Sequence, residues 1–258
     1  MRYVVAIKQV PDTMEVRTGE DGSLVRAGVP AIMDPYSQSA LMQTLSLKED
    51  GDTVAVVTMG PPQAEQMLRR CIGLGADSAY LLTDRDFAGA DTWATARVLA
   101  AFIGRYEPDA DLYIFGRQTI DGDTGQVPAE VAQLIDSQQF YYTSSLRIVD
   151  DGFEAVQDYG SFIRTSRVPR GSVVSFGDAD AGGCLQSLSG YIRGSRADIA
   201  TIGRVDLGLG LYSVGLKGSK TAIVSSSTVK DGRKGMKVEI TNPSTAADFI
   251  IKEAKAVR

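Results

Sequence analysis

The chain has 258 residues, of which 43% are hydrophobic and 23% are charged, and its formal net charge is −5. This composition is ordinary for a soluble globular protein, and the acidic balance offers no electrostatic basis for binding nucleic acid. With no histidine and two cysteines, the chain cannot supply a histidine base or histidine metal ligands, so we expect no metal site and no catalytic side chain.

The sequence also predicts a cytoplasmic protein. No apolar run approaches the roughly 18 residues that a membrane span needs, so we expect no membrane span. The first ten residues lack the long apolar core and cleavage pattern of a signal peptide. Two cysteines do not make a disulfide framework, which suits a reducing compartment.

Up to about residue 140, short apolar runs alternate with longer segments of helical period. This alternation predicts βαβ units, and therefore an α/β fold with an open, mostly parallel twisted sheet and helices on both faces. The predicted strands are residues 3–10, 53–59, 79–82 and 111–115. The predicted helices are a segment from Pro35 to about 47, then 63 to about 72, 91–105 and 127–135.

The second half of the chain has a different pattern. Short strands separated by turns are predicted at 141–149, 153–157, 161–167 and 172–176. Residues 177–220 are rich in Gly and Ser and weakly periodic, which is typical of a functional loop or a partner-wrapping arm. A final helix is predicted at 244–257. We therefore expect an α/β domain over residues 1–200 and, over 201–258, a C-terminal arm and helix that pack on a partner subunit.

Four loops follow predicted strands, at the sheet edge where open parallel sheets bind ligands. They are residues 8–12, 58–61, 89–92 and 116–126. In the last of them, Gly116, Gly122 and Gly125 allow backbone amides to face an anion at the helix that follows. Asp121 and Asp123 oppose a phosphate there unless they cap the helix or bind backbone amides. A plain surface turn explains the same pattern equally well.

Other polar residues beside these loops also have two interpretations. Asp91 has the signature of a helix N-cap, and this structural role is favoured. Thr92 and Thr95 share one face of the helix, where they either bind a pyrophosphate or remain exposed. Lys8 by itself is best explained as an ion-pair partner. Because neither a P-loop nor a Rossmann glycine motif is present, any nucleotide must bind through another set of loops.

Five stretches of the chain match a known family. They are VVAIKQVPDT (4–13), MDPYSQSALMQTLSLKE (33–49), VVTMGPPQAEQMLRRCIGLGAD (56–77), DLYIFGRQTIDGDTGQ (111–126) and, more faintly, GLGLYSVGLKGSKT (208–221). These stretches resemble the electron transfer flavoprotein beta subunit, nearly continuously over residues 1–135. The resemblance implies a Rossmann-like, adenine-nucleotide-binding domain and a heterodimer with an alpha subunit that carries its own FAD.

The resemblance also implies electron relay instead of stand-alone catalysis. In ordinary members of the family the beta site holds AMP, and in flavin-bifurcating members it holds an FAD that accepts hydride from NADH. The segment DFAGADTWATA (86–96) resembles the bifurcating type, and it puts Thr92 and Thr95 where that group contacts the diphosphate. Electrons would then pass to ferredoxin or flavodoxin and, through the alpha-subunit FAD, to a flavin dehydrogenase. The alternatives are an ordinary subunit with structural AMP and a single-chain nucleotide-binding stress-type protein.

The loops and the resemblance together predict cofactor-binding residues in all four loops and at a few positions outside them. They are Ala6, Lys8, Asp34, Met59, Asp91, Thr92, Thr95, Gly116, Arg117, Gln118, Thr119, Asp121, Gly122, Asp123, Thr124, Gly125, Gln126 and Val127. Asp34 departs from the family, which usually has asparagine there, and Pro128 replaces a glycine and removes one backbone donor. The Pro-Arg-Tyr loop with which many members dock acyl-CoA dehydrogenases is missing from 177–200, so the resemblance does not identify the dehydrogenase.

Overall fold

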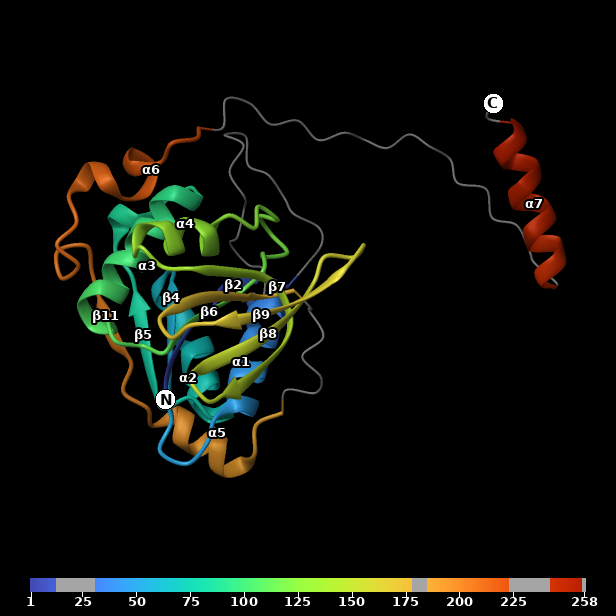
Figure 1. Ribbon diagram of the computed structural model, residues 1–258. Coiled ribbons are helices and arrows are strands. Elements are labelled where there is room, and N and C mark those ends of the chain that lie inside the picture. Colours follow the sequence, from blue (N-terminus) through green and yellow to red (C-terminus); the bar gives the residue numbers. More distant parts are fainter. Residues whose placement is uncertain (13–30, 178–184, 223–241, 257–258) are drawn as a thin grey trace. The chain divides into compact units, whose positions relative to one another are not determined.

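The computed structural model describes residues 1–12, 31–177, 185–222 and 242–256 (Figure 1). The chain divides into two compact units, Met1–Val224 and Ser225–Arg258. In the second unit, α7 spans Pro243–Ala256, close to the predicted final helix, of which residue 257 lies outside the described residues. A partner-wrapping role for residues 201–258 stays a prediction.

A nine-stranded sheet forms the centre of the first unit, in the order β11-β5-β4-β1-β6-β10-β7-β8-β9. Neighbouring strands from β11 to β7 pair in parallel, whereas β8 pairs antiparallel with both β7 and β9. The strands are β1 (Arg2–Ala6), β4 (Thr53–Met59), β5 (Ser78–Leu82), β6 (Leu112–Gly116), β7 (Gln139–Val149), β8 (Gly152–Asp158), β9 (Ile163–Val168), β10 (Ser172–Phe176) and β11 (Ala200–Ile202). This arrangement confirms the predicted α/β fold.

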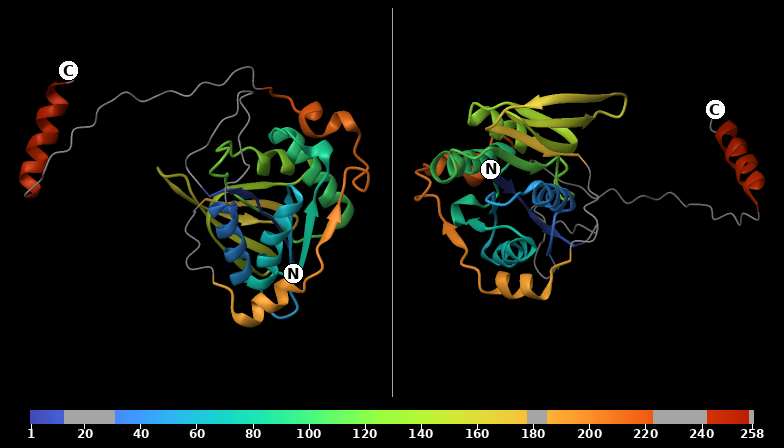
Figure 2. Two further views of the ribbon diagram at one scale, coloured as in Figure 1. Left: turned by 180° about the vertical axis from the view of Figure 1, so that it is seen from behind. Right: turned by 60° about the horizontal axis from the view of Figure 1, so that its bottom comes forward.

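Helices cover both faces of the sheet (Figure 2). One apolar cluster joins the sheet to α1 (Pro35–Leu47) and α2 (Glu65–Leu74), and a second joins its other face to α3 (Thr92–Tyr106) and α4 (Val127–Leu134). The central strands are buried on both faces, which explains their continuous apolar runs. Each fully buried Val, Leu, Ile or Phe side chain stabilises the fold by roughly 1.5–3 kcal/mol.

The first predicted strand, residues 3–10, is in fact two strands. β1 ends at Ala6, and β2 (Gln9–Pro11) pairs antiparallel with β3 (Ala31–Met33) in a separate two-stranded sheet. The chain turns at Lys8, whose N–H donates to the Ser37 hydroxyl at 3.2 Å instead of to a neighbouring strand. Both pieces are apolar and β-branched, so the sequence pattern does not reveal the break between them.

Residues 185–220 contain more regular structure than the weak periodicity of 177–220 indicates, while residues 178–184 lie outside the described part. The segment includes α5 (Leu188–Ser195), β11 and two short turns of helix, η3 (Leu211–Ser213) and α6 (Gly215–Gly218). A Cβ atom added at Gly190 would lie 2.3 Å from the Gly73 carbonyl oxygen of α2, and one at Gly194 would lie 2.2 Å from that of Arg69. These glycines therefore allow α5 to pack closely against α2. The Gly- and Ser-rich composition of the segment, by contrast, suggests a loop.

Two further 3₁₀ turns precede helices on opposite faces of the sheet. η1 (Pro62–Ala64) leads directly into α2, which is why that helix begins two residues later than predicted. η2 (Arg85–Phe87) connects β5 towards α3. The remaining predicted helices and strands of the first 140 residues agree with the structure to within a residue or two.

Candidate functional site

The loops that follow β1 and β6 meet at a topological switch point. The two strands are neighbours in the sheet, but the chain leaves β1 for α1 on one face and leaves β6 for α4 on the other. Ligands of open α/β sheets bind in the crevice that such diverging loops create at the carboxyl ends of the strands. The predicted fourth loop, residues 116–126, lies at this point.

Asp34 connects the start of α1 to the loop 116–126. One carboxylate oxygen accepts the Ser37 N–H at 3.0 Å and so caps α1, and the other accepts the Ile120 N–H at 2.9 Å. The side chain is fully buried. Burial raises the pKa of Asp34, and the two amides and the nearby Lys8 only partly offset this effect. Each of the two carboxylate oxygens thus has its own N–H donor, whereas an asparagine side chain has a single oxygen. Its contact with a nucleotide stays a prediction.

Lys8 holds the same loop from the β1 side. Its ammonium group lies 2.7 Å from the Asp121 carboxylate and 3.2 Å from the Thr119 hydroxyl. The Asp121 side chain is only 5% exposed, so this pair neutralises a buried charge beside the loop. Asp123 instead accepts a hydrogen bond from the Gln118 amide. Both aspartates thus have side-chain partners within or beside the loop.

Arg117 is held between two tyrosine rings at the start of the loop. Its guanidinium carbon lies 5.1 Å from the centre of the Tyr36 ring and 5.3 Å from that of Tyr142. The Tyr141 hydroxyl lies within hydrogen-bond distance of the carbonyl oxygens of Arg117 and Gly125, near the two ends of the loop. The sequence does not connect these tyrosines with the loop, because they come from α1 and β7 and no local pattern links them to it.

The starts of α3 and α4 differ in how their amides are satisfied. Asp91 caps α3 by accepting the Ala94 N–H at 2.9 Å, which confirms its predicted structural role. Its other oxygen accepts the N–H groups of Lys220 and Thr221. Burial acts to raise the pKa of Asp91, but these amides outweigh it and lower that pKa. By contrast, Gln126, the N-cap residue of α4, makes no side-chain hydrogen bond to the helix amides.

Thr92 brings the third and fourth loops together. Its hydroxyl oxygen lies 3.0 Å from Gln126 Oε1 and 3.1 Å from Glu130 Oε1. Burial raises the pKa of Glu130, with the Asp91 charge acting in the same direction and the bond from Thr92 opposing them. Glu130 was not among the predicted residues. A residue one turn into a helix after a proline looks like an ordinary surface carboxylate in the sequence.

Residues 21–177 match the family model of the electron transfer flavoprotein domain. The chain belongs to the electron transfer flavoprotein family. It is 36% identical to the electron transfer flavoprotein subunit beta of Thermoanaerobacterium thermosaccharolyticum, over 91% of each chain. It is 35% identical to the caffeyl-CoA reductase-Etf complex subunit CarD of Acetobacterium woodii, over 99% of this chain and 98% of the relative. It is 38% identical to protein FixA of Azotobacter vinelandii, over 86% and 82%.

Its relatives make this chain an electron transfer flavoprotein of the beta type, as the sequence predicted. Beta subunits of this family pair with an alpha subunit. None of the helices in the described part of the chain has the length and apolar character needed to cross a membrane. The described residues also contain no cluster of three or more acidic or cysteine side chains that is suited to a metal ion.

The glycines of this beta-type loop have different structural roles. Gly116 lies against the first turn of α1, where an added Cβ atom would be 2.7 Å from the Tyr36 carbonyl carbon. Gly125 has a φ of 63°, and an added Cβ atom would lie 2.7 Å from the Tyr141 hydroxyl. At Gly122 an added Cβ atom would meet only the Thr119 hydroxyl, at 3.6 Å. The fold itself therefore explains Gly116 and Gly125 but not Gly122.

The remaining predicted residues lie around the same edge of the sheet. Ala6 and Met59 end β1 and β4 and are half-buried, and Thr124 is exposed in the loop. Thr95 lies one turn into α3, where its N–H donates to the Asp91 carbonyl oxygen. Val127 is the first residue of α4 and packs against the apolar cluster beneath it. Their contact with a cofactor stays a prediction.

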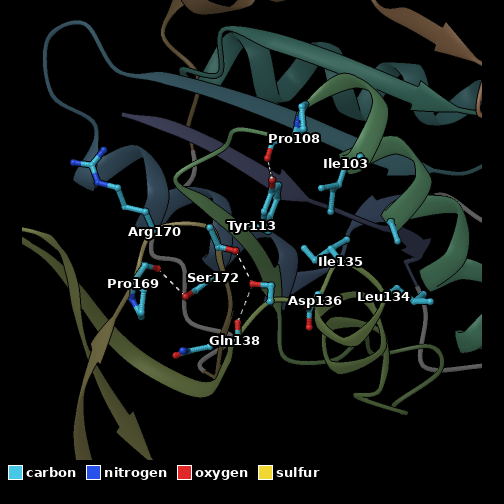
Figure 3. Close-up of a pocket in the computed structure, with 14 residues that line it drawn as sticks. Ile103, Pro108, Tyr113, Leu134, Ile135, Asp136, Gln138, Pro169, Arg170 and Ser172 are labelled. Atoms are coloured by element: carbon cyan, nitrogen blue, oxygen red, sulfur yellow. Dashed lines mark hydrogen bonds between the residues drawn. The ribbon is translucent and has the colours of Figure 1, made fainter.

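A cavity of about 550 Å³ lies at the opposite edge of the sheet (Figure 3). It is lined by residues that precede β6, β7 and β10, including Pro108, Gln138 and Arg170, and by the last turns of α3 and α4. Helix C-termini present carbonyl oxygens and a partial negative charge, which disfavour phosphate. We therefore place the candidate nucleotide site at the loops after β1 and β6 and not in this cavity.

Proposed function

We propose that this chain is the FAD-holding beta subunit of a flavin-bifurcating electron transfer flavoprotein. With its alpha subunit it accepts hydride from NADH and divides the electrons between two acceptors. One acceptor is a low-potential carrier, ferredoxin or flavodoxin. The other, reached through the alpha-subunit FAD, is a flavin dehydrogenase. We assign this work to the cytoplasm and attribute no catalytic side chain to this subunit.

The start of α4 is the observation that carries the nucleotide role. The N-cap residue of this helix, Gln126, makes no side-chain hydrogen bond to the helix amides, and the helix dipole adds partial positive charge at the same place. The open space beside Gly122 leaves room for a ligand to approach the loop backbone. The residues present thus fit a phosphate group of an adenine nucleotide.

Two observations support a diphosphate, and therefore FAD. Thr92 at the start of α3 lies next to Gln126 at the start of α4, so two helix termini converge on one region. The segment 86–96 resembles that of bifurcating members. One relative is named as a subunit of a caffeyl-CoA reductase-Etf complex, which supports a flavin dehydrogenase acting on a CoA thioester as an acceptor.

A second candidate function is an ordinary electron transfer flavoprotein subunit that holds structural AMP. Asp91 already occupies the Ala94 amide of α3, and the Thr92 hydroxyl already has two acceptors. Of these two helix starts, α4 is then the one whose N-cap residue makes no side-chain hydrogen bond to the helix amides, and one terminus suffices for a monophosphate. A single-chain stress-type protein no longer has support, because the chain belongs to the electron transfer flavoprotein family.

The residues of this chain act by holding and orienting the nucleotide. When bound, FAD supplies the one-electron and two-electron redox chemistry. Lys8 binds Asp121 and Asp34 binds the Ile120 amide, so both hold the loop 116–126 in place. Little conformational freedom is therefore lost when a ligand binds. We propose that the α4 amides and Thr92 orient the phosphates.

A nucleotide inventory of the co-purified heterodimer tests the proposal. The ligands are released by denaturation, and FAD and AMP are counted per heterodimer by chromatography. Two FAD and no AMP support a flavin on this chain, and direct reduction of the complex by NADH supports bifurcation. One FAD with one AMP would reject the FAD proposal in favour of the AMP candidate.

A pair of variants tests whether Thr92, at the start of α3, contributes to FAD binding. Thr92→Val removes the hydroxyl, so the FAD content should fall if Thr92 holds the diphosphate. Thr165→Val removes an exposed hydroxyl from β9 and serves as the matched control. An FAD content that is equal in Thr92→Val and in the control would return Thr92 to a structural role.

A further inference from the structure

Glu130 is the one acidic residue in the first turn of α4, at the helix end to which we assign the phosphate. Its Oε1 atom faces the Thr92 hydroxyl, and its Oε2 atom is buried without a hydrogen-bond partner among the described residues. A buried carboxylate oxygen that no donor satisfies is costly in its charged form. This arrangement is therefore poorly suited to an ionised Glu130.

The Thr92 hydroxyl has one proton and two acceptors within 3.1 Å, Gln126 Oε1 and Glu130 Oε1. An ionised carboxylate is the stronger acceptor, so it takes this proton. The hydroxyl then has no proton to donate to a phosphate. Protonation of Glu130 removes its demand for this proton, because the neutral carboxyl group carries its own O–H donor. The proton is then shared between Gln126 Oε1 and a bound phosphate, which as an anion is the stronger acceptor.

The charge of an ionised Glu130 also disfavours phosphate binding at the start of α4. An ionised Glu130 places a negative charge in the first turn of α4, where it occupies the favourable potential that a phosphate would use. Across from it, Asp91 at the start of α3 is the charged group that acts on Glu130 among the described residues. Thr92, the side chain that binds the Glu130 carboxyl group, is neutral, and no cation is among the groups that act on Glu130 in the described part of the chain.

We propose that Glu130 is a proton-coupled competitor for the nucleotide phosphate, and that nucleotide binding takes up one proton at this side chain. The proton comes from solvent and binds a carboxylate oxygen of Glu130, and the Thr92 hydroxyl turns its own proton towards the phosphate. This inference rests on the proposed nucleotide role of the chain. Binding takes up a proton because a phosphate beside Glu130 disfavours its charged form and so raises a pKa that burial already raises.

The test is the affinity of the nucleotide-stripped heterodimer for AMP between pH 5.5 and 8.5, in the wild type and in Glu130→Gln. Above the pKa of the free Glu130, the wild-type Kd should rise by up to about tenfold per pH unit relative to that of Glu130→Gln. Because the AMP phosphate itself titrates near pH ~6, only the difference between the two profiles is interpreted. Calorimetry in buffers of different ionisation enthalpy should count about one more proton taken up by the wild type.

Glu65→Gln is the matched control, because Glu65 is also an acidic residue in the first turn of a helix, α2. Its pH profile should coincide with that of the wild type. Parallel profiles of the wild type and Glu130→Gln would overturn the inference while leaving the nucleotide site intact. Failure of all three proteins to bind AMP or FAD at any pH would overturn both the inference and the proposed function. Equal melting temperatures at acidic pH show that the substitutions leave the fold unchanged.

Discussion

Four carboxyl groups around the switch point differ in their partners. Asp34 binds two backbone amides, Asp121 pairs with Lys8, Asp91 caps α3, and Glu130 has one oxygen without a described partner. Hydrogen bonds to a carboxylate favour its charged form, whereas burial disfavours it. The balance between these two effects differs from residue to residue, so the four groups are expected to respond differently to pH and to substitution.

Asp34→Ser separates the two roles of Asp34. A serine keeps the N-cap of α1, so the free energy of unfolding should change by less than about 1 kcal/mol through that bond. The serine is too short to reach the Ile120 amide, which loses a charge-assisted hydrogen bond of roughly 1.5–3 kcal/mol. We expect faster hydrogen exchange at Ile120 and an affinity for AMP about tenfold or more lower. Asp109→Asn at an exposed site is the control, and unchanged exchange at Ile120 would contradict the assignment.

We expect the contribution of Asp91 to the stability of the fold to be lost in acid. Its folded-state pKa is lowered by backbone amides, so the stability that it contributes is present above its ordinary pKa and is lost as the pH falls through the lowered value. Asp91→Ala should lower the free energy of unfolding by about 1 kcal/mol at neutral pH through loss of the cap. Denaturant titrations at several pH values should show that the difference from the wild type shrinks in acid. A constant difference would show that the charge of Asp91 is not involved.

The elements of the site are held together by contacts between loops. The loop 116–126 touches α1 through Gly116, the segment after β1 through Lys8, β7 through Tyr141 and α3 through Gln126. Its conformation is thus set by four different elements and not by its own sequence alone. A loop that is fixed in this way keeps its backbone amides in place for a ligand at little entropic cost.

Gly122 and Gly125 predict opposite outcomes for the same substitution. Gly125→Ala should destabilise the chain without any ligand, because the residue has a φ of 63° and its Cβ atom would clash with the Tyr141 hydroxyl. Gly122→Ala should leave the melting temperature of the stripped complex unchanged and lower its affinity for AMP if the backbone approaches the phosphate. Thermal melts and binding isotherms of both variants distinguish these effects. Unchanged affinity in Gly122→Ala would place the phosphate away from this part of the loop.

At the scale of the whole molecule, the order of the strands decides where a ligand can bind. The sheet grows to one side through β4 and β5 and then to the other through β6 and β10. The resulting crevice brings together loops that are far apart in the sequence. The cavity near Arg170 lies at the other edge, where helix C-termini meet, so the two edges differ in charge as well as in shape.

A ligand that binds only the folded complex should stabilise it. Adding AMP to the stripped heterodimer at about 100 times its Kd should raise the free energy of unfolding by roughly 2.7 kcal/mol, and the melting temperature should rise with AMP concentration. Adenosine, which lacks the phosphate, is the control and should give a much smaller shift at equal concentration. Equal shifts with both ligands would mean that the α4 terminus does not bind the phosphate.

The sequence by itself determined the α/β class, most of the strands and helices, the Asp91 cap and the family. These properties depend on local signals: periodicity, the N-cap pattern before α3, and contiguous motifs such as residues 111–126. It did not reveal the break at Lys8, or the helix α5, whose glycines pack on α2, because those features are decided by neighbours distant in the chain.

Only the tertiary structure decided which residues of the candidate site meet. Asp34 reaches Ile120 across 86 positions of sequence, and Lys8 reaches Asp121 across 113. It also placed Glu130 beside Thr92, with one carboxyl oxygen that has no hydrogen-bond partner within the described ranges of the chain. No single segment carries such information, because hydrogen bonding and burial at a switch point depend on how several loops converge after the sheet has formed.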